Sequence, residues 1–303
     1  MEIRVLKYFL EVAKEGNITR AAEHLHVSQP TISKQIKELE EELGVRLFTR
    51  TNYAIKLTQP GVLLKERAED IIGLVNKTGS EFKSLDDISG DIYIGAAESQ
   101  LMQYFAQAVK SVMDKYPKIH INIFSGDSAG ICERLDKGID DFGLILNYFD
   151  PKKYNYYWMS NEKKFDTWGV LMRKDDPLAT KSSLKLNNLI GLPLICSKQW
   201  KDESMSHWFK DNTNKLNLVA TYNLAYNASV LVKQHIGYAI MLDGLINTGK
   251  DSEFCFVPIS DASKAGLNII WRKNQTFSPA ARLLMDELEL RYSKQAKESN
   301  DKT

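Results

Sequence analysis

One short stretch limits what this chain of 303 residues can fold into more than any other part of it. Residues 19–39 read TRAAEHLHVSQPTISKQIKEL. They contain two amphipathic helical patterns joined by a tight, non-helical connection at residues 26–28. The small pair Ala21-Ala22 lets the two helices cross closely. Ser28 can cap the second helix through its hydroxyl, and Pro30 is tolerated in the first turn. The stretch therefore predicts a helix-turn-helix.

The second predicted helix separates an apolar side from a polar side. Its apolar residues recur at i, i+4, i+7 and i+11, as in one buried stripe: Ile32, Ile36, Leu39 and Leu43. Gly44 can end the helix. Residues 26–37 carry two lysines and no acid, and residues 43–58 add three cations, again without an acid. An ordinary helix pair with a polar outer face is the alternative, but this charge pattern favours a DNA-binding surface.

Short hydrogen-bonding groups and cations on that face suit base edges and phosphates in a major groove. Base contacts are expected from Gln29, Thr31 and Ser33. Phosphate contacts are expected from Lys34, Lys37, Arg50 and Lys56. The expected surface is completed by Ser28, Pro30 and Tyr53, the last of them in a wing of short strands at 45–48 and 54–57.

Residues 1–61 resemble the winged helix-turn-helix of the LysR-type transcriptional regulators. The matching residues are Phe9, Ala13, Ala21, Ala22, Leu25, Val27, Ser28, Gln29, Ser33, Ile36, Leu39, Glu40, Leu43, Gly44, Leu47, Phe48, Arg50, Leu57, Thr58 and Gly61. Two positions depart from the family pattern: Tyr53 replaces a frequent basic residue of the wing, and Pro60 replaces a frequent Ala. The resemblance continues more loosely over nearly the whole chain. It implies an α+β multidomain fold with a winged helix-turn-helix, a long linker helix and a two-subdomain α/β effector domain similar to a periplasmic binding protein.

A long helix is predicted after Thr58, which can cap it, and runs to about residue 85. Its apolar residues recur with the 4-3 spacing of a heptad seam, with Thr78 in the one gap: Leu64, Ala68, Ile71, Val75, Phe82 and Leu85. An amphipathic helix that lies on its own domain is the alternative, but the length and the strict spacing favour a two-chain coiled coil. The family's linker helix dimerises the DNA-binding domains, so we expect a homodimer or homotetramer that reads two half-sites.

From residue 89 onward, short apolar runs alternate with amphipathic helices, which predicts two mainly parallel sheets. Strands are expected at 92–95, 119–124, 142–146, 168–172, 194–196, 219–222, 238–242, 254–257 and 267–271, and helices near 101–115, 129–137, 204–212, 224–235 and 278–293. The expected domains are a DNA-binding domain at 1–58, a linker helix at 59–88 and an effector domain at 89–303. The resemblance divides the last into subdomain I, 89–161 plus 267–295, and subdomain II, 162–266.

Open α/β sheets bind ligands beyond the carboxyl ends of their strands, where loops lead into helix N-termini. Three loops fit this position: 97–100, 126–129 and 223–227. The resemblance implies an inducer in the cleft between the subdomains, held by loops at these positions. The expected contacts are Ser99, Gln100, Ser128, Asn223 and Asn227, with Asn147, Ser197 and Asp243 at other strand ends. Helix capping is the alternative role for the Ser and Asn residues.

Two further features bear on the ligand. Trp168 and Trp200 are candidates for a stacking wall, with a place in the core as the alternative. Glu98 and Asp127 stand in two of the three loops with no Arg or Lys beside them. They disfavour a bare anion and suit a zwitterion, an amine or a polar neutral ligand.

Composition and missing motifs argue against other classes of protein. The net charge is only +1, no run of eighteen apolar residues predicts a membrane span, and the first residues do not read as a signal peptide. Three isolated cysteines read as buried thiols rather than a metal site. No GxSxG, GxxxxGK[ST] or HExxH motif occurs. We expect a cytoplasmic regulator that is not an enzyme and uses no cofactor or metal.

The expected partners of such a regulator are double-stranded promoter DNA, a small-molecule effector and RNA polymerase, with no membrane. Two alternatives stay open. The chain could be a constitutive DNA binder whose C-terminal domain serves assembly only, although polar loops at the strand ends argue against this. An enzyme with an unrecognised active site is the more remote alternative.

Overall fold

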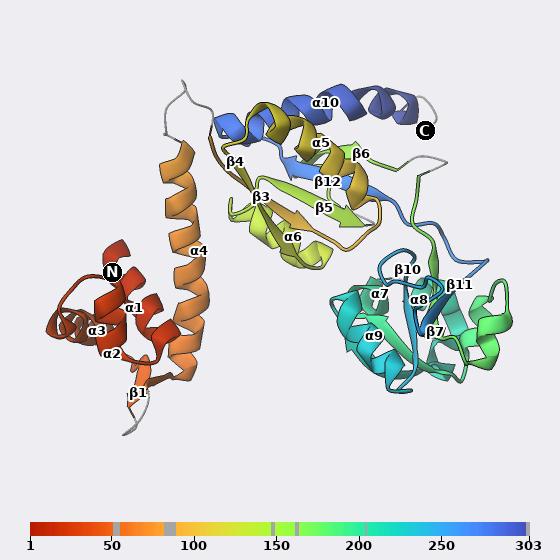
Figure 1. Cartoon of the computed structure of the whole chain (residues 1–303), viewed down its shortest axis with the longest axis horizontal. Helices are drawn as coiled ribbons and strands as arrows, with labels where there is room; N and C mark the ends of the chain where they lie inside the picture. Colours follow the sequence, from red (N-terminus) through yellow and green to blue (C-terminus); the bar gives the residue numbers. More distant parts are fainter. Residues whose placement is uncertain (51–54, 82–88, 147–148, 161–163, 204, 301–303) are drawn as a thin grey trace. The chain divides into compact units, whose positions relative to one another are not determined.

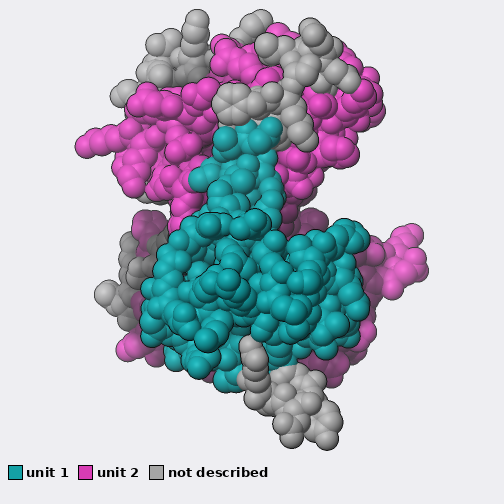
Figure 2. Space-filling model, turned by 90° about the vertical axis from the view of Figure 1, so that its left-hand side faces the viewer, with its two compact units in different colours: residues 1–83 teal, residues 84–303 magenta. Residues whose placement is uncertain are grey.

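The computed structural model describes residues 1–50, 55–81, 89–146, 149–160, 164–203 and 205–300. The chain forms two compact units, residues 1–83 and residues 84–303, coloured separately in Figure 2. Each unit has a hydrophobic core of its own. Among the described residues, no helix is both long enough and apolar enough to cross a membrane.

The first unit is a winged helix-turn-helix, as predicted. Its elements, shown in Figure 1, are α1 (Ile3–Glu15), α2 (Ile18–His24), α3 (Gln29–Leu43), β1 (Phe48–Arg50), β2 (Ile55–Leu57) and α4 (Gln59–Glu81). Phe9 and Val12 of α1, Ala21 of α2 and Ile32 of α3 are fully buried together in its core. The absence of a large side chain at Ala21 lets α2 pack closely against its neighbours.

Local side chains set the ends of the helices in this unit. The amide oxygen of Asn17 accepts hydrogen bonds from the backbone N–H groups of Thr19 and Arg20, at 2.8 and 3.2 Å, and so caps α2. Ser28 caps α3 by accepting from the N–H of Thr31 at 3.4 Å. Gly44 ends α3 in the left-handed region, with φ of 69°.

The wing is an antiparallel pair in which Thr49 lies opposite Lys56. Strand β1 begins later than predicted, at residue 48. The reason is Glu40 of α3, whose carboxylate accepts hydrogen bonds from the backbone N–H groups of Leu47 (2.7 Å) and Phe48 (3.2 Å). The carbonyl of Leu47 accepts from the N–H of Thr58. These bonds fasten the wing to the C-terminal part of α3.

Helix α4 packs on α1 of its own unit. Thr58 accepts from the N–H of Gly61 at 3.0 Å and donates to the carbonyl of Arg46 at 2.6 Å, which fixes the start of the helix. Three members of the predicted heptad seam face this unit's core: Ala68 is fully buried, and Leu64 and Ile71 pack against the same cluster.

The alternative of an amphipathic helix lying on its own domain therefore describes this part of α4. Phe82 and Leu85 lie outside the described residues.

The first sheet of the second unit has the strand order β4-β3-β5-β12-β6. Its strands are β3 (Gly90–Ala96), β4 (Ile119–Ser125), β5 (Phe142–Leu146), β6 (Tyr154–Trp158) and β12 (Leu267–Arg272). Helices α5 (Met102–Lys115) and α10 (Pro279–Asn300) pack together and α10 contacts β3 and β6, whereas α6 (Ser128–Asp136) contacts β3, β5 and β12. Figure 1 shows α6 on the opposite face of the sheet from α5 and α10.

The second sheet has the strand order β11-β7-β10-β8-β9. Its strands are β7 (Trp168–Arg173), β8 (Pro193–Ser197), β9 (Asn217–Tyr222), β10 (Tyr238–Leu242) and β11 (Phe254–Pro258). Its helices are α7 (Lys198–Glu203), α8 (Met205–Phe209) and α9 (Ala225–Lys233), with short 3-10 helices at Pro177–Thr180, Leu186–Leu189 and Lys210–Lys215. The helix predicted near 204–212 is thus broken into short pieces and preceded by α7.

The prediction of mainly parallel sheets is wrong for half of the strand pairs. In each sheet two pairs are parallel and two are antiparallel. The chain passes from one sheet to the other twice, between β6 and β7 and between β11 and β12. Strand β12 is therefore not reached through a crossover helix in its own sheet, and it runs antiparallel to both β5 and β6.

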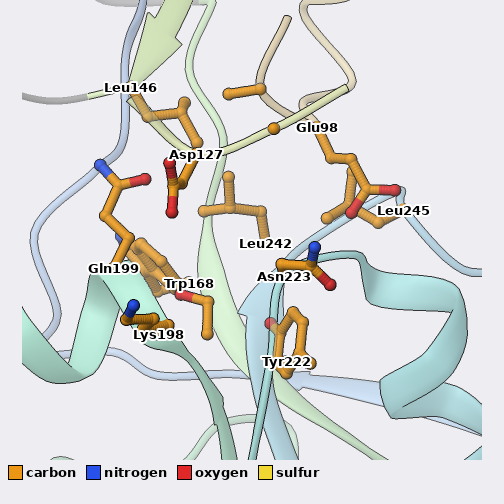
Figure 3. Close-up of a pocket in the computed structure, with 13 residues that line it drawn as sticks. Glu98, Asp127, Leu146, Trp168, Lys198, Gln199, Tyr222, Asn223, Leu242 and Leu245 are labelled. Atoms are coloured by element: carbon orange, nitrogen blue, oxygen red, sulfur yellow. The ribbon is translucent and has the colours of Figure 1, made fainter. Parts of the chain in front are cut away.

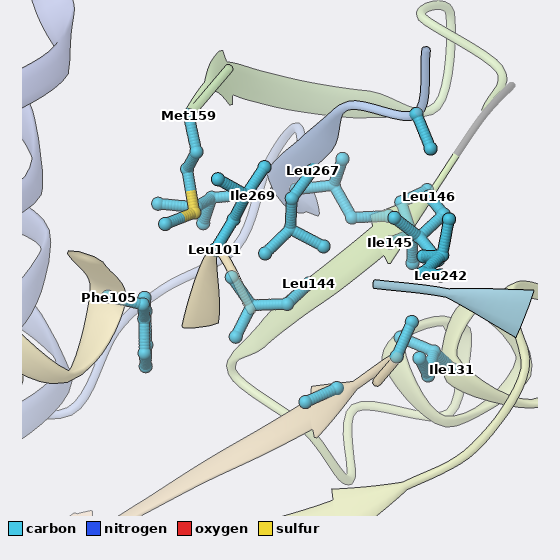
Figure 4. Packing of buried hydrophobic residues seen from close by; sticks show 14 of the residues in the cluster. Leu101, Phe105, Ile131, Leu144, Ile145, Leu146, Met159, Leu242, Leu267 and Ile269 are labelled. Atoms are coloured by element: carbon cyan, nitrogen blue, oxygen red, sulfur yellow. The ribbon is translucent and has the colours of Figure 1, made fainter. Parts of the chain in front are cut away.

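One buried apolar cluster includes residues of both sheets. Figure 4 shows part of it, where Ile269 of β12 pairs in register with Leu144 of β5 and Phe105 of α5 is fully buried. Leu242 of the second sheet belongs to the same cluster. Strand ends of both sheets therefore meet over an apolar base.

Candidate functional site

The first candidate site is the outer face of α3 together with the wing. Most of the predicted DNA-binding side chains are exposed there: Ser28, Gln29, Pro30, Thr31, Lys34, Lys37 and Lys56, with Ser33 half-buried. Arg50 is the last residue of β1. Tyr53 lies outside the described residues. Because Ile32, Ile36 and Leu39 are buried on the other side, α3 presents this face in a fixed orientation.

Several of these exposed side chains already form hydrogen bonds or ion pairs within the helix. The hydroxyl groups of Ser28 and Thr31 lie 2.7 Å apart, so both take part in the N-terminal cap of α3. Lys34 and Lys37 form ion pairs with Glu38 and Glu41 at 3.7 and 3.3 Å. Exposed ion pairs of this kind contribute little free energy, so both ammonium groups remain available to a phosphate.

The second candidate site is a cavity between the loops of the two sheets. It is lined by Ala97, Glu98, Gly126, Asp127, Leu146, Trp168, Ser197, Lys198, Gln199, Tyr222, Asn223, Leu242 and Leu245 (Figure 3). Apart from Trp168, which begins β7, these residues end strands of both sheets or follow them, as expected of a ligand site in open α/β sheets. The cavity measures about 60 Å³, well below the roughly 300 Å³ at the lower end of typical small-molecule sites.

Some of the predicted effector contacts line this cavity or are hydrogen-bonded to its lining, and others do not. Ser197 and Asn223 line the cavity, and Ser128 is hydrogen-bonded to its lining residue Gln199. Ser99, Gln100, Asn227 and Asp243 are not among the lining residues. Asn147 lies outside the described residues.

Ser99 and Asp243 belong instead to the crossing between the sheets, around Asp166. The Ser99 hydroxyl donates a short hydrogen bond to the carboxylate of Asp166 and accepts from the N–H of Leu101 at 3.0 Å. Asp243 accepts from the N–H of Thr167 at 2.8 Å. Burial raises the pKa of Asp166 to about 6, and the nearby charge of Asp243 acts in the same direction, whereas the hydrogen bond from Ser99 lowers it.

Two side chains tie the cavity together across the sheets. Glu98, after β3, accepts a hydrogen bond from the N–H of Ala225 at 2.6 Å, the first residue of α9. Gln199 of α7 donates to the hydroxyl of Ser128 at 3.0 Å and accepts from its N–H at 3.4 Å. The sequence showed Glu98 and Gln199 only as polar residues near strand ends, because their partners are 127 and 71 positions away.

Capping explains two of the polar residues at the strand ends. Asp127 accepts from the N–H of Gly130 at 2.8 Å and caps α6. Ser197 accepts from the N–H of Trp200 at 3.0 Å. The two candidate tryptophans differ: Trp168 lines the cavity, whereas Trp200 is buried in the core against Trp208 and Phe209.

Among the described residues, the three cysteines are not part of a group that could hold a metal ion. Cys196 is buried, and burial raises the pKa of both Cys132 and Cys255. Within the part of the chain that the structure describes, one group of three potential ligands lies close together: Glu11, Glu15 and His24. The Nδ1 atom of His24 is 3.1 Å from Glu11 and 3.5 Å from Glu15, and these contacts join α2 to α1.

Comparison with known proteins gives consistent matches over both units. The family model described as "Bacterial regulatory helix-turn-helix protein, lysR family" matches residues 3–62, and the one described as "LysR substrate binding domain" matches residues 86–291. The HTH-type transcriptional regulator YtlI of Bacillus subtilis (strain 168) is 29% identical over 312 residues, which covers 98% of this chain and 92% of that protein. BsdA, an HTH-type transcriptional regulator of the same organism, is 33% identical over 221 residues, covering 72% of this chain and 74% of that protein.

Solved structures share the fold at lower sequence identity. The crystal structure of CbnR, a LysR family transcriptional regulator, has a TM-score of 0.72 and 20% identity, covering 95% of this chain and 98% of that chain. Full-length CbnR in complex with its target DNA has a TM-score of 0.70 and 20% identity, with 95% and 99% covered.

Proposed function

This chain belongs to the LysR family of bacterial helix-turn-helix regulatory proteins, and on that premise we propose that a small-molecule effector bound between its two sheets modulates its binding to promoter DNA. The observation that carries this proposal is the cavity itself. Its lining comes from strand ends of both sheets, so a ligand bound there would contact both and favour one arrangement of them over another.

The proposed DNA contacts are those that the outer face of α3 and the wing offer. We assign base reading to Gln29, Thr31 and Ser33 and phosphate contacts to Lys34, Lys37, Arg50 and Lys56. Ser28 and Pro30 shape the start of the helix, and Tyr53 is assigned to the wing. The exposure of Gln29, Lys34 and Lys37 on a helix whose other side is buried supports this assignment.

The proposed effector contacts are Ser197, Asn223 and, through Gln199, Ser128. Glu98 and Asp127 join them as charged lining residues. Ser99 and Gln100 are hydrogen-bonded to Asp166, and Asp243 to Thr167. These bonds at the crossing favour a role in joining the sheets over direct contact with an effector. Asn147 and Asn227 remain proposals from the sequence.

We further propose a homo-oligomer, either a dimer or a tetramer, that acts in the cytoplasm and communicates with RNA polymerase. Apolar side chains that α4 leaves exposed support self-association: Val62 (48% exposed), Leu63 (57%) and Leu74 (43%). They lie on the side of the helix away from the core residue Ala68, where a partner helix could cover them. The described part of the originally expected seam, Leu64, Ala68, Ile71 and Val75, is at least half-buried within one chain.

The test of the proposed function is footprinting on the intergenic DNA next to the protein's own gene, with and without a pool of metabolites. A protected site whose pattern changes with one metabolite fraction is the expected result. Protection that no fraction changes would favour a constitutive DNA binder whose second unit serves assembly only. If no site on the DNA is protected even at low salt, the DNA-binding assignment is contradicted.

A further inference from the structure

The charges that line the cavity restrict the class of molecule that can bind there. Resting on the proposed effector site, we propose that the cavity takes a small ligand with a protonated amine on an apolar body, and that it rejects simple carboxylates. The argument has three parts: how the helix N-termini are occupied, which charges remain, and what surrounds them.

The chain's own acceptors already take some of the first N–H groups of the helices that begin at the cavity. An exposed helix N-terminus attracts anions because its first backbone N–H groups lack partners. At α9 the carboxylate of Glu98 takes the N–H of Ala225. At α6 the side chain of Asp127 takes the N–H of Gly130, and Gln199 takes the N–H of Ser128. A carboxylate ligand at these N-termini would lie beside or displace these acceptors, and two of them, Glu98 and Asp127, are themselves negative.

The remaining charge of the cavity favours a cation. Glu98 and Asp127 are half-buried, whereas Lys198, the cation among the lining residues, is exposed and therefore more strongly screened by solvent. Each carboxylate accepts its backbone N–H through one oxygen, Oε2 of Glu98 and Oδ1 of Asp127. The other oxygen of each can accept from an ammonium group, which carries three donors.

The rest of the cavity suits a short apolar body. Leu146, Trp168, Leu242 and Leu245 line it beside the two acids (Figure 3). A volume of about 60 Å³ limits that body to a few carbon atoms. Trp168 adds aromatic surface to this apolar lining. A short aliphatic amine and an amino acid with an aliphatic side chain share this chemistry.

The experiment compares ligands that differ only in their charged groups. Full-length protein is titrated calorimetrically with a panel of short aliphatic primary amines, the corresponding amino acids and the corresponding carboxylates, for example 3-methylbutylamine, leucine and 4-methylpentanoate. We expect at least one amine or amino acid to bind more tightly than its matched carboxylate, by about tenfold or more. This is the effect of gaining one charged hydrogen bond. Comparison of the amine with the amino acid shows whether a carboxylate beside the ammonium is tolerated.

Variants tie the binding to the two acids. Glu98→Gln keeps an oxygen that can accept from Ala225 and should weaken binding of the amine by about tenfold; Asp127→Asn is the second variant. Asp114→Asn, which changes an exposed acid on α5, should leave binding unchanged. Circular dichroism first shows that each variant is folded, and Asp114→Asn should also leave the melting temperature and the footprint on DNA unchanged.

The inference is overturned if a carboxylate binds as tightly as its amine, if no amine or amino acid of the panel binds, or if neither acid variant affects the binding. Its failure is distinguishable from failure of the proposed function. A metabolite fraction that changes the footprint while the amines do nothing would leave the effector site standing and remove only the ligand class. If no metabolite fraction changes the footprint, the proposed function itself is contradicted.

Discussion

Two exposed side chains of α3, Gln29 and Lys37, are expected to act differently on DNA. An amide that reads a base edge discriminates between sequences by about 1–3 kcal/mol, whereas a cation on a phosphate acts on all sequences alike. Gln29→Ala should therefore weaken binding to the operator and leave binding to random duplex almost unchanged. Lys37→Ala should weaken both equally and reduce the salt dependence of binding by about one counterion. Fluorescence anisotropy on both duplexes over a range of salt concentrations measures this.

The matched control for Gln29 is Gln35 of the same helix. The amide of Gln35 donates to Glu38 at 2.7 Å and is half-buried, so Gln35→Ala should not relax specificity. Equal losses on operator and random duplex for Gln29→Ala would remove its assignment as a base reader.

Asp166 is expected to make the stability of the second unit depend on pH. Its pKa is raised from 3.8 to about 6, mainly by burial. Between these two pH values, Asp166 is protonated in the folded state and ionised in the unfolded state. The contribution of Asp166 to the free energy of unfolding is therefore fully present below about pH 4 and is lost as the pH rises to about 6. This one group should remove roughly 3 kcal/mol over that range. Asp166→Asn should therefore flatten this fall.

All five tryptophans lie in the second unit, so denaturant unfolding followed by tryptophan fluorescence reports on that unit. The free energy of unfolding is compared between wild type and variant from about pH 4 to pH 7. Asp286→Asn, which alters an exposed acid of α10, is the control. Identical pH profiles for wild type and Asp166→Asn would show that Asp166 does not titrate in this range.

What could be predicted at single residues depended on the distance to their partners along the chain. The caps of Ser28 and Gly44 involve immediate neighbours, so the sequence was enough. The bonds of Ser99 to Asp166 and of Glu98 to Ala225 span 67 and 127 positions. The sequence shows that Asp166 and Glu98 are acids that can accept hydrogen bonds. Only the fold determines which donor each of them binds. Ser99, which the sequence predicts as an effector contact, is hydrogen-bonded to Asp166 at the sheet crossing.

At the scale of single elements, α4 shows why heptad spacing alone does not choose between two stripes of one helix. Leu63 and Leu74 are eleven residues apart, as are Leu64 and Val75, so two adjacent stripes fit the same heptad spacing. Contact with α1 selects the stripe of Leu64 and Ala68 for the core. Nothing in the spacing itself makes that choice, because it depends on the shape of the neighbouring helix.

The exposed stripe of α4 should carry the association of two chains. Leu63→Gln combined with Leu74→Gln should raise the dissociation constant of the dimer about a hundredfold or more, because each buried Leu contributes about 1.5–3 kcal/mol. Analytical ultracentrifugation measures the constant, and the melting temperature of the monomer should change little. Leu290→Gln, at a 75% exposed position of α10, is the control. An unchanged dissociation constant in the double variant would place the interface elsewhere.

Replacement of two glycines of α4 by alanine should change the stability of the first unit in opposite directions. A Cβ atom at Gly61 would lie 2.1 Å from the carbonyl oxygen of Leu47, whereas one at Gly73 would meet nothing within 4 Å. Gly61→Ala should destabilise the first unit by about 1–3 kcal/mol or more, as overpacking does. Gly73→Ala should stabilise it by up to about 1 kcal/mol, through helix propensity.

Thermal unfolding by circular dichroism, with tryptophan fluorescence marking the second unit, measures both glycine variants. Destabilisation by Gly73→Ala, or none by Gly61→Ala, would contradict this account of how α4 begins on the wing.

Strand β6 was the one strand of the two sheets that the sequence did not indicate. Its residues, YNYYW, lack the apolar run that marked the other strands. It is an edge strand that pairs only with β12, and its partners come more than a hundred positions later in the chain. Edge strands need fewer apolar residues because one side has no neighbour. The aromatic side chains of this strand range from buried Tyr154 to exposed Trp158.

At the scale of the whole molecule, the fold class followed from the order of the elements, but the strand directions did not. Alternation of strands and helices indicates a parallel sheet only while the chain stays in one sheet. Here β7 and β12 each begin after the chain has changed sheets, and both enter antiparallel to their neighbours. The same two crossings bring loops of both sheets to one cavity, so the feature that limited the topology prediction also creates the candidate site.

A regulator of the proposed kind must obey a reciprocal relation between its two ligands. If a bound effector changes the affinity for the operator by some factor, the operator must change the affinity for the effector by the same factor. With an amine that binds, operator affinity is measured by anisotropy at zero and at saturating amine, and amine affinity is measured by calorimetry with and without saturating operator duplex. We expect equal factors of about 5–150, the usual range of such coupling.

Random duplex is the control for this coupling, because it engages mainly the phosphate contacts and should show a smaller factor. A factor of one on the operator, with the amine demonstrably bound, would mean that the ligand prefers neither DNA-bound nor free protein. The cavity would then be a binding site without a regulatory role, and the constitutive DNA binder would be the better description. A factor that differs between the two directions would instead mean that one ligand also binds outside its assigned site, since linkage permits no other source of asymmetry at equilibrium.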